Sequence, residues 1–91
     1  MSKKFIARCT GSYDIRADLK IKAMAFAVDN IYHNHRRISV EDIHLSIVGA
    51  DDYDGFYTVE YSFIFSTFGE SELDVEKIIK KGESLSILDC Q

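Results

Sequence analysis

A strict alternation of apolar and polar residues opens the chain, and it constrains the fold more than any other feature. From Phe5 to Ala17 every second residue is apolar or small, and nearly all residues between them are polar. Successive side chains of a β-strand point to opposite faces, so this pattern predicts one long strand with one face on a core. A turn at Gly11 would instead make a hairpin, and a bulge or bend there is the intermediate case. We favour a single bent strand, because a turn is expected to break the alternation.

A long helix is predicted next, over residues 19–35. Its apolar positions recur at helical spacing and include Ala23, Ala27 and Ile31. Asp18 is placed to cap its first turn, since a carboxylate there can accept from free backbone amides. The stretch 23–28 has no polar residue. We therefore expect this helix to be covered on more than one side, either within the domain or by another copy of the chain.

Two more strands are predicted in the middle of the chain. Residues 42–49 alternate apolar and polar, and residues 56–67 alternate aromatic or β-branched residues with polar ones. Asp54-Gly55 between them is a hairpin turn signal. A second helix is predicted between Ser71 and Gly82, and residues 85–90 complete the pattern as a short last strand.

The order β-α-β-β-α-β predicts an α+β protein with a ferredoxin-like fold, built as a single domain over residues 1–91. Its four-stranded antiparallel sheet would carry two helices on one face, with the last strand beside the first. Cys9 and Cys90 could then lie near each other, although the sequence does not fix the register. A hydrophobic content of 46% and a charged content of 29% suit a globular protein. No apolar stretch has signal or membrane length, which predicts a cytoplasmic location without a membrane partner.

The charges of the chain divide unevenly between its two parts. Residues 1–37 contain eight Lys or Arg and three acids, whereas residues 38–91 contain three Lys or Arg and twelve acids. These balances of +5 and −9 give the net charge of −4. Such a small acidic protein is expected to offer its acidic side to a basic partner.

Two groups of residues resemble metal sites only in part. His33 and His35 would point about 200° apart on a regular helix, so they could share a metal only if the helix frays, and His44 is distant in sequence. The run of acids before Gly55 lacks ligands at the first and twelfth positions of a calcium-binding EF-hand loop. No phosphate-binding glycine loop is present. The sequence thus predicts no metal, no cofactor and no identifiable catalytic residue, and it leaves an enzyme as an open alternative.

The segment from Asp54 to Tyr61 resembles the core motif of RNA-recognition domains, with matches at Gly55, Phe56, Val59 and Tyr61. Asp54 replaces the basic residue of that motif, and Glu60 would repel phosphates from the open face of the sheet. An RNA-binding sheet face is therefore an alternative, and direct binding of nucleic acid is not the expected function.

The run Tyr13 to Asp18, followed by an Ala-rich helix, resembles a strand-to-helix unit common in small accessory proteins of bacteriophages and mobile elements. This resemblance implies a non-enzymatic inhibitor of a host enzyme or defence complex, of the kind that sometimes imitates nucleic acid. It assigns no role to any single residue.

These observations predict a non-catalytic protein-interaction module, of the inhibitor or nucleic-acid-mimicking decoy type. Its partner would be a basic protein surface, such as that of a host protein that binds nucleic acid. The alternative is a small ferredoxin-like enzyme or ligand-binding domain that works as an oligomer, for example as a homodimer. The residues predicted to bind the partner are Glu41, Asp42, Asp51, Asp52, Tyr53, Asp54 and Glu60.

Overall fold

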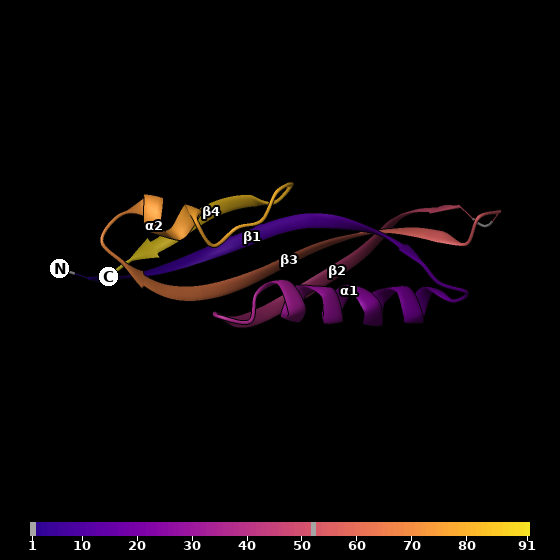
Figure 1. Ribbon diagram of the computed structural model, residues 1–91, viewed down its shortest axis with the longest axis horizontal. Helices are drawn as coiled ribbons and strands as arrows, with labels where there is room; N and C mark the ends of the chain where they lie inside the picture. Colours follow the sequence, from indigo (N-terminus) through magenta and orange to yellow (C-terminus); the bar gives the residue numbers. More distant parts are fainter. Residues whose placement is uncertain (1, 52) are drawn as a thin grey trace.

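The computed structural model describes residues 2–51 and 53–91. Its elements are β1 (Lys3–Arg16), α1 (Lys20–Asn34), β2 (Ser39–Asp51), β3 (Phe56–Gly69), α2 (Glu72–Glu76) and β4 (Ser84–Cys90). The four strands form one antiparallel sheet in the order β2-β3-β1-β4 (Figure 1). The predicted α+β protein with a four-stranded antiparallel sheet and two helices is confirmed, and the last strand pairs with the first as expected.

The molecule is elongated, with principal extents of 53 × 18 × 17 Å. Its length comes from the two central strands, which have 14 residues each and pair without interruption from Lys3 opposite Gly69 to Arg16 opposite Phe56. A strand rises about 3.3 Å per residue, so 14 residues account for most of this length. The turn between β2 and β3 lies at one end of the molecule, whereas α2 and the two chain termini lie toward the other (Figure 1).

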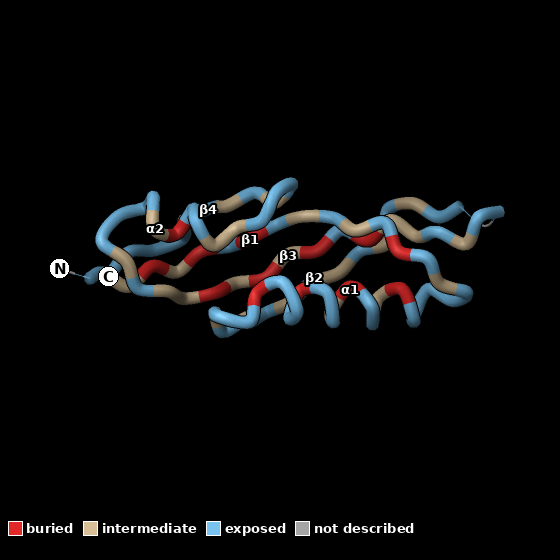
Figure 2. The backbone as a smooth tube through the Cα atoms, viewed as in Figure 1, coloured by how far each residue is buried: buried red, intermediate tan, exposed pale blue. Residues whose placement is uncertain are grey.

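The core lies on the face of the sheet that carries the odd-numbered residues of β1. Buried residues follow one another along β1 and β3 in Figure 2, and the largest of them are Phe63 and Phe65. Both helices pack on this face, since Ile31 of α1 and Val75 of α2 belong to the same buried cluster. Ala23 and Ala27 are fully buried, and their small side chains let α1 lie close to the strands.

Gly11 interrupts neither β1 nor its pairing with β3. The prediction of a single strand is therefore confirmed, and the hairpin alternative is wrong. The one irregularity of β1 is a register shift against β4, between Ile6 and Ala7.

The structure differs from the prediction at the start of α1, whereas the start of α2 follows it. The N-cap of α1 is Leu19 and no side chain caps it, so the predicted capping role of Asp18 is wrong. Asp18 lies one residue too early and instead pairs with Lys22 at 3.1 Å, one turn further on. At α2, the Asp74 carboxylate accepts from the Glu70 and Ser71 amides at 2.7 and 3.3 Å, as a capping residue does.

α2 ends at Glu76 and does not continue to Gly82. The segment after it is shaped by tertiary contacts: Ile78 and Ile79 both pack against the core, and the Glu83 side chain turns inward. The predicted central strands are longer in the structure, because β2 spans Ser39–Asp51 and β3 continues to Gly69.

The two cysteines are free and lie apart. Cys9 pairs with Leu85 across the sheet, whereas Cys90 pairs with Phe5, four residues earlier on β1. Four residues of a strand span about 13 Å, which is too far for a disulfide. Cys9 is buried and Cys90 is exposed.

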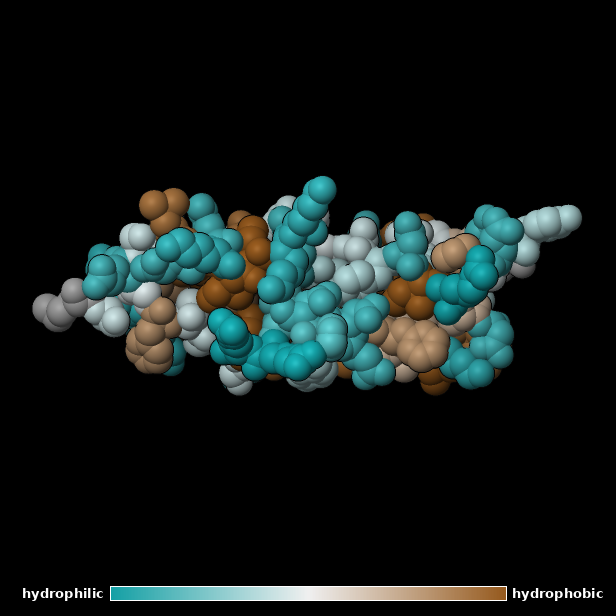
Figure 3. Space-filling view, in the orientation of Figure 1, coloured by the Kyte–Doolittle hydropathy of each residue, from teal (hydrophilic) through white to brown (hydrophobic). Residues whose placement is uncertain are grey.

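The surface mixes hydrophilic and hydrophobic residues on the face shown in Figure 3. Several large apolar side chains of α1 are exposed, among them Ile21, Phe26 and Tyr32. The sheet covers one side of the apolar stretch 23–28, and a further contact of this helix with another copy stays a prediction. Among the described residues, no helix has the length and apolar character to cross a membrane.

Candidate functional site

The predicted partner-binding residues do not form one surface. Asp51, Tyr53 and Asp54 lie at the turn between β2 and β3, and we call these three the acidic turn. Glu41 and Asp42 lie near the other end of β2, about 30 Å away along the strand. The remaining two complete the set: Glu60 lies in the middle of β3, and Asp52 is outside the described residues.

Basic residues accompany both groups of acids. Arg8 and Glu41 flank Ile64 in one row across the sheet, and Arg16 lies in the row of Phe56 and Asp51. The guanidinium of Arg16 stacks over the Phe56 ring at 4.7 Å. The acids predicted to bind the partner are therefore interspersed with cations along the sheet, and two of them, Asp51 and Asp54, lie together at the acidic turn.

The acidic turn is held by its own hydrogen bonds. The Asp51 carboxylate accepts from the backbone amides of Tyr53 and Asp54 at 3.1 and 3.2 Å. The Gly55 amide donates to the Asp51 carbonyl at 2.8 Å, with Gly55 at a φ of 71° that suits glycine. The Ala17 amide donates to the Gly55 carbonyl at 2.9 Å and ties the turn to the chain after β1. Tyr53 projects from this frame with 99% of its surface exposed.

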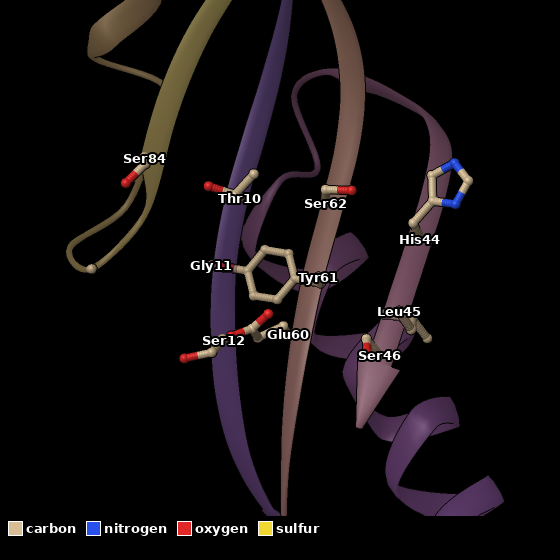
Figure 4. A pocket seen from close by; sticks show the side chains of 11 residues that line it. Thr10, Gly11, Ser12, His44, Leu45, Ser46, Glu60, Tyr61, Ser62 and Ser84 are labelled. Carbon is tan, nitrogen blue, oxygen red and sulfur yellow. The ribbon is translucent and has the colours of Figure 1, made fainter. Parts of the chain in front are cut away.

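A polar hollow of about 480 Å³ occupies the open face of the sheet (Figure 4). One row of pairs crosses all four strands there and contains Ser84, Thr10, Ser62 and His44. Ser12, Ser46 and Glu60 form the next row. The lining offers hydroxyl groups, one carboxylate and the His44 imidazole, which are suited to hydrogen bonding with a polar ligand.

Ser62, His44 and Asp42 of this region have the residue types of a Ser-His-Asp hydrolase site. His44 Nε2 lies 3.1 Å from Asp42 Oδ1, and Ser62 is the cross-strand partner of His44. However, the His44 ring extends away from Ser62 in Figure 4. The side chains of His44 and Asp42 are 72% and 61% exposed, so water screens their interaction. We interpret the pair as a surface contact at the bulge of β2, where Asp42 has a φ of 53°.

A buried polar cluster lies on the opposite, helix-covered face. It consists of Cys9, His35, Tyr61 and Glu83. His35 Nε2 lies 3.0 Å from Glu83 Oε2, and the Tyr61 hydroxyl donates to the same oxygen. The other carboxylate oxygen accepts from the Lys80 amide at 2.7 Å. The side chains of His35 and Glu83 are only 1% and 4% exposed. Glu83 therefore links the C-terminal end of α1, β3 and the loop before β4 in the interior of the protein.

The cluster sets the ionisation of its members. Burial alone would raise the pKa of the Glu83 carboxyl, but hydrogen bonds from Tyr61, Lys80 and His35 outweigh it and hold that pKa below its usual value. Burial, and then the charge of Glu83, raise the pKa of the Cys9 thiol to about 12. Burial, and then the hydrogen bond to Glu83, raise the pKa of the Tyr61 hydroxyl. Cys9 is therefore a thiol at neutral pH and a poor nucleophile.

Cys9, His35 and Glu83 are residue types that bind metals, and their donor atoms lie within 4.8 Å of one another. In the structure the Glu83 carboxylate interacts with both His35 and Cys9. Every buried side-chain nitrogen and oxygen of the described residues has a hydrogen-bond partner. We interpret the cluster as an internal connection between the helix, the sheet and the last loop.

Sequence reasoning did not find this cluster, although one signal pointed to it. His35 continues the four-residue spacing of Ala23, Ala27 and Ile31, which are all buried. A polar residue on the buried stripe of a helix needs a buried partner. The identity of that partner, Glu83, depends on how the loop before β4 folds back, and no periodic pattern reports this.

Comparison of the chain with protein-family models, with curated proteins and with solved structures finds no match.

Proposed function

We propose that the protein is a non-catalytic interaction module that binds a basic surface of another protein through its acidic turn. The observation that carries the proposal is the exposure of Tyr53, at 99%, together with the hydrogen bonds from the Tyr53 and Asp54 amides to the Asp51 carboxylate. Because these hydrogen bonds already restrain Tyr53 and Asp54, the two residues lose less conformational freedom on binding, and more of the contact energy remains as affinity.

The chemistry of the turn suits such a role. Tyrosine is among the residues most often found at the energetic centres of interfaces, because it combines a large apolar ring with a hydroxyl group. Asp54 beside it would meet a Lys or Arg of the partner, and such charge pairs speed association at low salt. The turn lies at the end of the elongated molecule, where it can enter a groove (Figure 1).

Three broader features belong to this proposal. The strand order read from β4 is 4-1-3-2, which supports a ferredoxin-like fold made of two interleaved split βαβ units. Two free cysteines suit the reducing cytoplasm. A module that fills a basic groove with carboxylates would act as an inhibitor, in the manner of phage proteins that oppose host defence.

The experiment is a comparative affinity purification with the full chain as bait and a bacterial lysate as the source of partners. The test variant combines Tyr53→Ser with Asp54→Lys. The matched control combines Tyr32→Ser with Asp29→Lys, which changes the same two residue types at exposed positions of α1.

We expect mass spectrometry to identify a protein that the wild type and the α1 control retain and that the turn variant loses. Its retention should decrease as the salt concentration of the wash rises, because screening weakens exposed charge pairs. Equal retention by the turn variant and the wild type would contradict the proposal.

A further inference from the structure

A second concentration of charge, of the opposite sign, surrounds a cavity of about 610 Å³ at the C-terminal end of α1. Six of the eight lining residues are basic or imidazole side chains: His33, His35, Arg36, Arg37, Lys77 and Lys80. Among the described residues, no Asp or Glu lines it. We call it the basic cavity. The chain as a whole has a net charge of −4, so this local excess of positive charge does not follow from its composition.

The two walls of the basic cavity come from distant parts of the sequence. Arg36 and Arg37 follow the end of α1, whereas Lys77 and Lys80 follow α2. Glu83 holds both walls, because its carboxylate contacts His35 Nε2 at 3.0 Å and accepts from the Lys80 amide at 2.7 Å. The cations are thus brought together by a buried anchor and not by chance proximity of loose loops.

One arginine of the cavity is already oriented. The Arg36 Nε donates to the His33 carbonyl at 3.3 Å, and its Nη2 lies 3.0 Å from His33 Nδ1. A guanidinium only donates, so this imidazole nitrogen accepts. The contact fixes the plane of the Arg36 guanidinium beside the cavity, which reduces the entropy lost when it binds an anion.

One carboxylate, that of Glu83, lies buried against His35 behind the cavity and contacts the backbone of Lys80, not its ammonium group. Among the described residues, the only ion pair made by its arginines and lysines joins Lys77 to Asp74, at a long 3.8 Å. Four permanent cations around one cavity repel each other, and a bound anion would remove this repulsion. Arginine forks match phosphate oxygens in geometry, and a volume of about 610 Å³ lies within the range of small-molecule sites.

We propose that the basic cavity binds a phosphate-bearing small molecule of nucleotide size. Arg37 and Lys80, one from each wall, contact the phosphate groups, and Arg36 contributes its oriented guanidinium. This site is separate from the acidic turn, so either proposal can fail without the other.

Calorimetric titration of the full chain with adenosine triphosphate, and separately with inorganic pyrophosphate, tests the proposal at low ionic strength. We expect one site per chain for both probes. Arg37→Gln and Lys80→Gln should each weaken binding by about tenfold, as expected for loss of one charged hydrogen-bond donor. Lys3→Gln and Lys20→Gln remove the same charge outside the cavity and should leave the affinity within about twofold.

Three outcomes would overturn the proposal. The first is no binding of either probe. The second is equal weakening by the cavity and control variants, which would indicate attraction to overall charge. The third is binding of a short single-stranded oligonucleotide with none of adenosine triphosphate, which would assign the cavity to a nucleic-acid backbone. Circular dichroism of each variant separates loss of binding from loss of folding.

Discussion

The ring of Tyr61 occupies the space that a side chain would need at Gly11, its cross-strand partner on β1. A Cβ at position 11 would lie 2.3 Å from the Tyr61 hydroxyl oxygen and 2.5 Å from Cζ. The tyrosine cannot easily move, because its hydroxyl is bonded to Glu83 and its ring stacks on Tyr13 with centroids 4.6 Å apart.

Gly11→Ala is therefore expected to destabilise the protein by about 1–3 kcal/mol, the usual cost of overpacking. Urea unfolding followed by circular dichroism measures this change. Gly49→Ala is the control, since a Cβ there would meet only Thr58, at an ordinary 3.6 Å. Equal stability of the two variants would mean that the ring of Tyr61 moves aside at little cost.

Glu83→Gln should lower the free energy of unfolding by about 1–3 kcal/mol. The amide keeps the shape of the carboxylate but loses the charge-assisted hydrogen bonds to His35, Tyr61 and the Lys80 amide. Glu76→Gln replaces the same residue type at an exposed position and should change stability by less than about 0.5 kcal/mol. Chemical denaturation of both variants in parallel gives the comparison. An unchanged free energy of unfolding in Glu83→Gln would show that the charge of Glu83 adds no stability.

Acid should weaken the wild type more than Glu83→Gln. The folded pKa of Glu83 is below its ordinary value of 4.5, so the carboxylate stabilises the fold above that pH. This contribution is lost as the pH falls through the lower, folded pKa, where the native state must bind the proton. We expect the stability difference between wild type and Glu83→Gln to shrink as the pH falls below about 4.5. Thermal melts from neutral to acidic pH would reveal a constant difference if this reasoning is wrong.

The two cysteines should differ sharply in reactivity. Cys90 is exposed, whereas Cys9 is fully buried with a thiol pKa of about 12, raised mainly by burial. A thiol reagent such as Ellman's reagent should therefore modify one cysteine in the native protein and both in urea. Cys90→Ser should abolish the native reaction, and rapid labelling of that variant would indicate that the core around Cys9 opens easily.

The strands of this fold could be predicted because each has one face on the core. The alternation of apolar and polar residues around Phe5 and around Phe63 indicates which face is buried. It predicts the bounds of β1 and β3 to within about two residues. The end of α2 could not be predicted in the same way. Ile78 and Ile79 satisfy a helical pattern, but their contacts with the core and the inward turn of Glu83 depend on distant residues.

The candidate sites were predictable to a smaller extent. The acidic turn was visible as a run of acids at a hairpin signal, because turns are local. The basic cavity was not, since Arg37 and Lys80 are 43 positions apart in the sequence and meet only after the chain has folded. Lys77 and Lys80 belong to the acidic part of the sequence, but in the folded protein they lie beside Arg36 and Arg37 of the basic part.

The proportions of the molecule, 53 Å by 18 Å by 17 Å, decide how its self-association must be measured. A rod experiences more friction than a sphere of equal mass, so a monomer of this shape leaves a gel-filtration column early and imitates a dimer. Light scattering reports mass independently of friction. Only a doubled scattering mass, and not an early peak, would demonstrate that two copies join.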